Sequence, residues 1–233
     1  MTPTNRILVI MAKAPRLGSV KTRLAESLSL QEVTELYRCL LNDTIALAQA
    51  LEQVELAIMC PASDVEDLSR GVANTARIVP QTGQGLAAGL ASVFNRFATS
   101  GQQRVIAFNS DSPHLPASVL EAAFDVLEAR DLVVGPTHDG GYYLVGARAS
   151  HSDLFASDGM GTANALEALL TRARALGLSV DLTDPFYDID VQGDLTRLAA
   201  ELRLAPARAP QTAVWLKQWG QAVAELRTGT EDL

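Results

Sequence analysis

The sequence predicts a single α/β domain in which helices flank a mainly parallel sheet. The chain has 233 residues, enough for one such domain to bury a sheet between helical layers. Apolar runs rich in β-forming residues alternate with segments of helical periodicity, as expected for parallel strands joined by helices. The run at 104–109 is apolar on both faces and predicts a central strand.

The individual elements follow from these runs. The expected strands are residues 6–12, 55–60, 76–80, 104–109, 132–135 and 142–147. The expected helices are residues 31–51, 63–71, 85–99, 117–130, 162–176 and 191–204, with Ser63 and Thr162 as N-caps. Ligands of open parallel sheets bind beyond the carboxyl ends of the strands, so the loops after Ala12, Pro80, Asn109 and Gly135 are the places to look for a site.

The last 29 residues form a separate segment. Residues 1–204 make up the predicted nucleotide-binding domain, while 205–233 begin as an Ala-Pro-rich linker and continue as an amphipathic helix at 212–226. Trp215 and Trp219 lie one turn apart on that helix. We expect both indoles to pack on the domain, and a contact in a homodimer is the alternative.

Composition excludes several classes of function. No apolar run approaches the roughly 20 residues of a membrane span, and no secretory signal is visible, so a soluble, cytoplasmic protein is expected. The net charge of −8 argues against a nucleic acid polymer as partner. Cys39 and Cys60 are expected to be buried thiols, and the three histidines to lie at the surface or in local hydrogen bonds.

Positive charge is concentrated at the N-terminus. Residues 1–25 contain Arg6, Lys13, Arg16, Lys21 and Arg23 but no acid, although the whole chain is acidic. The segment 13–24 directly follows the first strand, contains Gly18 and leads into a helix near Thr22. Such a loop can offer backbone amides and cationic side chains to phosphate oxygens. It lacks the glycine spacing of a Walker loop, and a solvated basic turn is the alternative.

Carboxylates occur at two places where a strand ends or an extended segment is expected. Asp111 follows the central strand and is placed to hold Mg²⁺ or Mn²⁺, although Asp in Ser-Asp-Ser-Pro also suits a plain turn. If residues 187–190 are extended, Asp188 and Asp190 point the same way, and either can complete a metal site with Asp111. Asp194 fits the first turn of a helix.

Two glycine-rich segments complete the pattern. Gln81 and Gly85 lie in a strand-to-helix segment where small residues let a base or ribose approach the backbone, although this is also a common turn. Asp139-Gly140-Gly141-Tyr142 breaks a strand and places a carboxylate and an aromatic ring at the edge of a pocket.

The ordered motifs resemble a known family. Lys-Ala-Pro-Arg-Leu-Gly-Ser-Val-Lys-Thr-Arg-Leu, Asp-Ser-Pro-His-Leu-Pro and Gly-Pro-Thr-His-Asp-Gly-Gly-Tyr-Tyr-Leu-Val-Gly resemble motifs of bacterial GT-A-type transferases known as arsenosugar-biosynthesis-associated glycosyltransferases. Lys-Thr-Arg-Leu is also similar to a motif of phospholactate guanylyltransferases. The chain departs from the family pattern at Gly85, Gly89, Val191 and Met160-Gly161. The resemblance implies a GT-A fold, that of nucleotide-diphospho-sugar transferases.

The residues and the resemblance together assign roles. The candidate nucleotide-binding residues are Ala12, Lys13, Gly18, Lys21, Arg23, Gln81 and Gly85. The candidate acceptor-binding residues are Asp139, Gly140, Gly141, Tyr142 and Thr162. Asp111 and Asp190 are the expected ligands of Mg²⁺ or Mn²⁺, with Asp188 as the alternative second ligand, and Asp111, Asp139 and Lys21 are the expected catalytic residues.

Three functions are compatible with these roles. The first is a metal-dependent glycosyltransferase that uses a nucleotide-activated donor and a small-molecule acceptor. The second is a nucleotidyltransferase that moves a nucleoside monophosphate from a triphosphate to a phosphorylated small molecule. The third is a nucleotide-binding protein without turnover, which the presence of both Asp111 and Asp190 disfavours.

Overall fold

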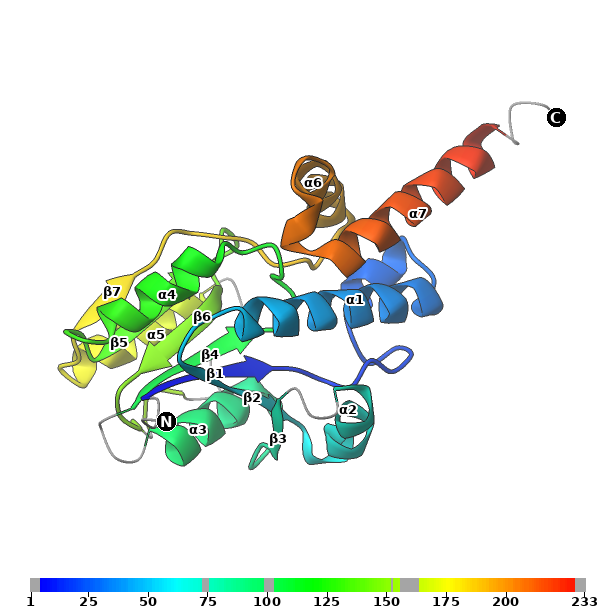
Figure 1. Cartoon of the computed structure of the whole chain (residues 1–233). Helices are drawn as coiled ribbons and strands as arrows, with labels where there is room; N and C mark the ends of the chain where they lie inside the picture. Colours follow the sequence, from blue (N-terminus) through cyan, green and yellow to red (C-terminus); the bar gives the residue numbers. More distant parts are fainter. Residues whose placement is uncertain (1–4, 73–75, 99–102, 152, 156–163, 229–233) are drawn as a thin grey trace.

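A seven-stranded sheet forms the centre of the molecule (Figure 1). The structure, a computed structural model, describes residues 5–72, 76–98, 103–151, 153–155 and 164–228. The strands are β1 (Arg6–Met11), β2 (Val54–Cys60), β3 (Arg77–Pro80), β4 (Arg104–Asn109), β5 (Leu132–Pro136), β6 (Tyr142–Ala147) and β7 (Val180–Leu182). Their order is β3-β2-β1-β4-β6-β5-β7, and only β6 runs antiparallel to its neighbours. The prediction of a mainly parallel sheet with β4 at its centre is confirmed.

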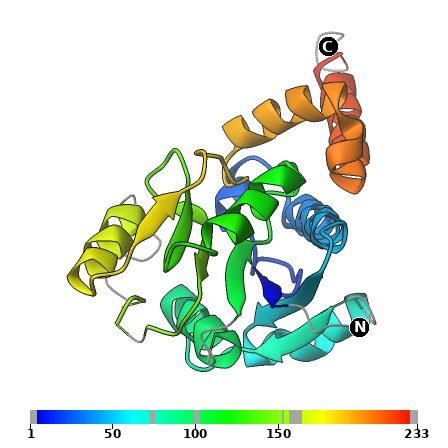
Figure 2. The same ribbon diagram turned by 60° about the vertical axis from the view of Figure 1, so that its left-hand side comes forward.

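Helices cover both faces of this sheet (Figure 2). On one face, α1 (Leu30–Gln49), α2 (Val65–Gly71) and α4 (Ala117–Val126) share a core with the strands. On the other face, α3 (Gly85–Phe97) and α5 (Ala165–Ala175) do the same. The sheet is therefore the middle of three layers.

The central strands contribute to both cores because strand side chains alternate. Leu8 and Ile10 of β1 pack toward α1 and α4, whereas Ile7 and Val9 pack toward α3. All four are buried, and burying each such side chain contributes about 1.5–3 kcal/mol. This burial on both faces explains why the strand runs in the sequence are apolar throughout rather than alternating.

The topology brings the predicted functional loops to one edge. The strands β1 to β4 run parallel, so their carboxyl ends meet at the same edge of the sheet. Because β4 and β5 are each antiparallel to β6, β5 also ends at this edge, and so does the β5–β6 hairpin. The loops after Met11, Pro80, Asn109 and Pro136 therefore converge.

The C-terminal segment packs against α1. The helix α6 (Gln192–Leu204) is followed by the short 3-10 helix η3 (Pro206–Arg208) and by α7 (Pro210–Thr228), so the predicted linker is a helical turn. Trp215 is buried and its ring stacks on that of Trp219, in a third cluster with residues of α1 and α6. The packing of Trp215 agrees with the interpretation that the indoles dock on the domain. A homodimer and the division at residue 204 stay predictions.

Several expectations about local structure were wrong. Ser63 does not cap α2, because a 3-10 turn, η2 (Ala62–Asp64), precedes that helix. Cys60 is buried as expected, but Cys39 is only half-buried. His114 is neither at the surface nor hydrogen-bonded: its side chain is 0% exposed, and neither ring nitrogen has a partner among the described residues. Thr162, the other predicted cap, lies outside the described residues.

The helices of the described residues are too short or too polar to span a bilayer.

Candidate active site

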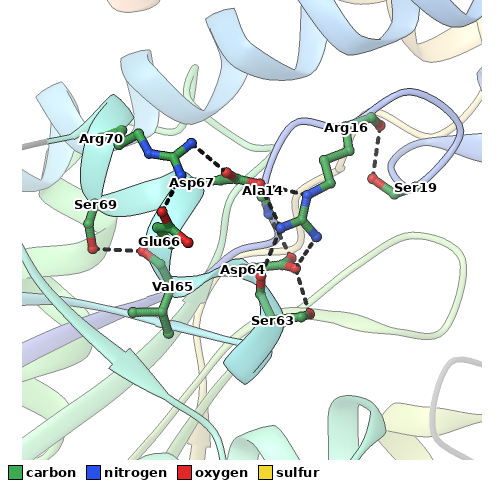
Figure 3. A network of polar contacts seen from close by, with 10 residues as sticks. All are labelled: Ala14, Arg16, Ser19, Ser63, Asp64, Val65, Glu66, Asp67, Ser69 and Arg70. Carbon is green, nitrogen blue, oxygen red and sulfur yellow. Dashed lines mark hydrogen bonds and ion pairs between the residues drawn. The ribbon is translucent and has the colours of Figure 1, made fainter.

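The loop after β1 is held by hydrogen bonds to the 3-10 turn η2 and to α2. The backbone N–H of Ala14 donates to the buried carboxylate of Asp64 at 2.8 Å, and the guanidinium of Arg16 bonds to Asp64 and Asp67 at 2.7 Å (Figure 3). Arg6, on β1, forms an ion pair with Asp125 at 2.7 Å. Of the five N-terminal cations, Arg6 and Arg16 therefore pair with carboxylates that line neither of the two cavities described below.

Lys21 lies where this loop enters the 3-10 helix η1 (Thr22–Glu26). Its ammonium group donates to Asp190 at 2.7 Å and makes a shorter contact with Asp111. The side chain is only 7% exposed. Burial alone would lower the pKa of Lys21, but the two carboxylates outweigh this effect and raise it, so the side chain is charged. Arg23 approaches Asp190 at 3.4 Å from the solvent side.

Three carboxylates form the centre of the site. Oxygen atoms of Asp111, Asp188 and Asp190 all lie within 4.8 Å of one another. Tyr187 and Ile189 are buried while Asp188 and Asp190 are half-buried, which agrees with the expectation that the two carboxylates share one side of an extended segment. Burial and the charge of Asp111 raise the pKa of Asp188 to about 7. Burial acts in the same direction on Asp190, but Lys21 and Arg23 outweigh it and lower the pKa of that carboxyl.

Hydrogen bonds fix the two segments that carry these carboxylates. Asn109 donates to the hydroxyl of Ser112 at 3.0 Å, and Ser112 donates to the carbonyl of Tyr187 at 3.1 Å. The carboxylate of Asp194 accepts from the backbone N–H groups of Asp190 and Val191. Asp194 therefore acts at the start of α6, as predicted, and holds the backbone of Asp190 in place.

The donor set suits a hard divalent cation. Mg²⁺ and Mn²⁺ prefer oxygen ligands, and here three carboxylates can each offer one. In addition, Oδ1 of Asp111 is buried without a hydrogen-bond partner among the described residues. The residues present therefore fit such an ion.

Two neighbouring cavities of about 590 Å³ each open beside these carboxylates. The first, the basic cavity, carries three cationic side chains, those of Lys13, Lys21 and Arg23. Its remaining walls come from Met11, Ala12, Ser19, Val20, Thr22, Tyr37, Met59, Pro61, Gln81, Gly85, Leu86, Ser110, Asp111 and Asp190. All the predicted nucleotide-binding residues except Gly18 line it. Gly18 lies at the exposed tip of the loop with a positive φ of 71° and lines neither of the two cavities.

The second, the acidic cavity, carries four carboxylates, those of Asp111, Asp139, Asp188 and Asp190. Its remaining walls come from Met11, Arg23, Leu86, Leu90, Ala107, Phe108, Asn109, Thr137, Gly141, Tyr142, Tyr143, Leu144, Val145 and Ala165. Asp111 and Asp190 line both cavities, so the two spaces meet at the carboxylate centre. Among the described residues, Arg23 is the one cationic side chain that lines this second space.

The β5–β6 hairpin forms the far wall of the acidic cavity. Oδ1 of Asp139 accepts from the hydroxyl of Thr137 at 2.5 Å and from the backbone of Gly141 at 3.3 Å, and the turn requires the positive φ of 87° at Gly140. Gly140 itself does not line the cavity. Tyr143 is buried and bonds to Thr183, so Tyr142 is the ring better placed for a ligand. Thr162 lies outside the described residues.

Sequence reasoning missed one polar group of the site. The hydroxyl of Tyr37, on α1, accepts from the backbone N–H of Lys13 at 3.1 Å and bonds to Ser110 at 3.0 Å. It joins the loop after β1 to the loop that carries Asp111. A tyrosine on the buried face of a predicted helix, whose hydroxyl needs a partner, is the only signal in the sequence that could have suggested it.

The fold is that of the nucleotide-diphospho-sugar transferases. More specifically, the chain belongs to the family described as "Uncharacterized protein conserved in bacteria (DUF2064)", whose model matches residues 44–162. A search of curated proteins found no match.

Solved structures agree with this assignment. A candidate nucleotide-diphospho-sugar transferase from Desulfovibrio desulfuricans G20 is 25% identical, with a TM-score of 0.87 over 95% of this chain and 98% of that one. A 4-diphosphocytidyl-2C-methyl-D-erythritol synthase from Anaerococcus prevotii DSM 20548 (10% identity, TM-score 0.55, 85% and 97% covered) shares the fold. So does an inositol-1-phosphate CTP transferase from T. maritima (14%, 0.54, 84% and 94%). These names agree with the expectation of a transferase. The association with arsenosugars and the similarity to guanylyltransferases stay predictions.

Proposed function

We propose that this protein is a metal-dependent transferase that takes a sugar from a nucleotide-activated donor and delivers it to a small acceptor without a phosphate group. One observation carries the proposal: a basic cavity and an acidic cavity meet at three carboxylates. The basic cavity suits the phosphates of a donor, and the acidic cavity suits the acceptor. The names of the structural neighbours, which include a nucleotide-diphospho-sugar transferase, support the donor class.

Each group has a role in this scheme. Lys13, Lys21 and Arg23 neutralise the diphosphate of the donor. Asp111 and Asp190, with Asp188 beside them, would hold Mg²⁺ or Mn²⁺, which would stabilise the charge of the departing nucleoside diphosphate. The bond between the sugar and the phosphate oxygen breaks, a bond from the acceptor oxygen to the same carbon forms, and Asp139 takes the proton of the acceptor hydroxyl.

Nucleotidyl transfer is the second candidate, and the three cations of the basic cavity favour it because a triphosphate carries more charge than a diphosphate. Its acceptor, however, would place a phosphate in the acidic cavity. There it would meet four carboxylates, and among the described residues only Arg23 could neutralise it. The charge of the acceptor cavity therefore favours sugar transfer.

A thermal-shift screen followed by a product assay separates the candidates. The screen compares nucleoside triphosphates with UDP-, GDP- and ADP-sugars, each with and without Mn²⁺. Stabilisation by a nucleotide-sugar and release of a nucleoside diphosphate support sugar transfer. Release of pyrophosphate from a triphosphate supports nucleotidyl transfer, and metal-independent binding without product supports a protein without turnover.

Replacing the central carboxylate tests the role of the metal site. Asp111→Ala removes a ligand shared by both cavities, so we expect the Mn²⁺-dependent part of the thermal shift to disappear. The control is Asp125→Ala, which removes an exposed carboxylate that pairs with Arg6 instead. If Asp111→Ala keeps the full Mn²⁺-dependent shift, Asp111 does not bind the metal.

A further inference from the structure

The ammonium group of Lys21 lies among the carboxylates assigned to the metal. It contacts Asp111 and lies 2.7 Å from Asp190, while its side chain is 7% exposed. Both of these carboxylates belong to the group of three whose oxygens lie within 4.8 Å of one another. The carboxylate centre is thus already neutralised in part by a cation from the protein itself.

A divalent cation and this ammonium group would compete for the same space. Mg²⁺ lies about 2.0–2.1 Å from its oxygen ligands. An ion that joined Asp111 to Asp190 through the oxygens that now accept from Lys21 would overlap the Nζ atom. An ion bound next to the Nζ atom would still be repelled by the charge of the ammonium group. This repulsion is strong because the site is largely shielded from water.

We infer that Lys21 and the divalent cation occupy the carboxylate centre in turn, and that the metal displaces Lys21 toward the phosphates of the donor. This inference rests on the proposed function, because it assumes that the carboxylates bind a metal. It adds that the empty enzyme holds its own counter-ion and that metal and donor bind cooperatively.

The surroundings of Lys21 allow such a movement. Its side chain also lines the basic cavity, so its ammonium group can leave the carboxylates by rotation about its own bonds. The backbone of Lys21 adopts the left-handed conformation, with φ 46° and ψ 43°, which is unfavourable for a residue with a side chain. The two ion pairs of its side chain help to keep it there.

Cooperativity follows from what happens to the displaced ammonium. If a metal binds alone, Lys21 loses two carboxylate partners and gains none, which makes binding weak. If a diphosphate is present, its oxygens replace those partners. Metal and diphosphate should therefore strengthen each other's binding, and this coupling is reciprocal.

Chemical labelling of the wild-type protein tests the displacement directly. The chain has three lysines, and Lys217, which is exposed and lines neither cavity, serves as the internal control. We expect acetylation of Lys21, followed by mass spectrometry, to be slow without metal and to rise severalfold once Mn²⁺ is bound. Pyrophosphate added with Mn²⁺ should slow it again. Unchanged labelling of Lys21, while electron paramagnetic resonance shows Mn²⁺ bound, would overturn the exchange.

Variants of Lys21 test the competition. Lys21→Met should bind Mn²⁺ alone more tightly than the wild type, by roughly tenfold, which is within the usual range of coupling between two binding events. Lys21→Arg keeps a cation and should bind Mn²⁺ weakly. Lys217→Met removes an exposed lysine of α7 that lines neither cavity, so it is the control and should leave Mn²⁺ binding unchanged.

The outcomes separate the two proposals. Equal or weaker Mn²⁺ binding by Lys21→Met would overturn the exchange and leave the metal-dependent transferase intact. No Mn²⁺ binding by any variant, with or without pyrophosphate, would overturn both the exchange and the metal-dependent function.

Discussion

Burial controls the protonation state of His114, which lies in the loop after β4. Its imidazole ring lies 4.8 Å from the ring of Phe186 and 4.5 Å from that of Tyr187, in the segment that leads to Asp188. Burial and the positive charges of Arg197 and Arg208 lower the pKa of His114 to about 3. The ring is therefore neutral and fills the space between the two segments that carry the carboxylates.

A dependence of stability on pH follows. In the unfolded chain, His114 takes up a proton near pH 6.5, whereas the folded protein resists it until about pH 3. The unfolded state thus binds more protons in this window, and His114 makes the fold less stable as the pH falls below 6.5. Between pH 7.5 and pH 5, this contribution should amount to about 2 kcal/mol.

Comparing the wild type with His114→Phe isolates this contribution. Phenylalanine fills similar space and does not titrate, so urea unfolding should show the variant gaining stability relative to the wild type as the pH falls. The raised pKa of Asp188 acts in the opposite direction, but it is present in both proteins and cancels in the comparison. A difference between the two proteins that does not change with pH would contradict this account.

At the scale of elements, hydrogen bonds hold the loop after β1 against η2 and α2. Asp64 is nearly buried and accepts from both the Ala14 backbone and Arg16, whereas Asp67 is more exposed and bonds to arginine side chains. Asp64→Ala should cost about 1–3 kcal/mol of stability because it leaves a backbone N–H without its partner. Asp67→Ala should cost about 0–1 kcal/mol. Thermal unfolding of both variants measures this, and equal losses would show that the tie to Ala14 contributes nothing.

The elements also show what the sequence can and cannot predict. The strands β1, β2, β4 and β6 were predicted to within one residue, because both of their faces are apolar. The strand β7 was not predicted. It has three residues, lies at the edge of the sheet and keeps Leu182 exposed, so no apolar pattern marks it.

The site, too, was predictable from the sequence only in part. Strand ends and charge predicted that Lys21, Asp111 and Asp190 would meet, and the structure brings them together. Which cation pairs with which carboxylate was not predictable, since the partners of Lys21 lie 90 and 169 residues away. Charge alone also could not show that Arg16 forms an ion pair with Asp64 instead of lining the basic cavity.

At the scale of the whole molecule, hydrogen bonds as well as the packing of its indoles hold α7 against α1. The carboxylate of Asp43, on α1, accepts from the backbone and the hydroxyl of Thr212, each at 2.7 Å, close to the start of α7. Asp43 and Thr212 are both buried. The C-terminal helix should therefore unfold together with the domain.

Tryptophan fluorescence tests this, because Trp215 and Trp219 are the only tryptophans of the chain and both lie on α7. We expect the fluorescence transition in urea to coincide with the loss of helical circular dichroism. A fluorescence transition at lower urea would mean that α7 detaches first and is not part of the cooperative unit.

Anomalous diffraction from crystals grown with Mn²⁺ and the nucleotide-sugar selected by the screen tests the central claim most directly. The account predicts one manganese peak bound by Asp111 and Asp190, with the diphosphate on the side of Lys13, Lys21 and Arg23 and the sugar directed toward Asp139. A manganese ion bound away from Asp111 and Asp190, or a diphosphate lying in the acidic cavity, would contradict it.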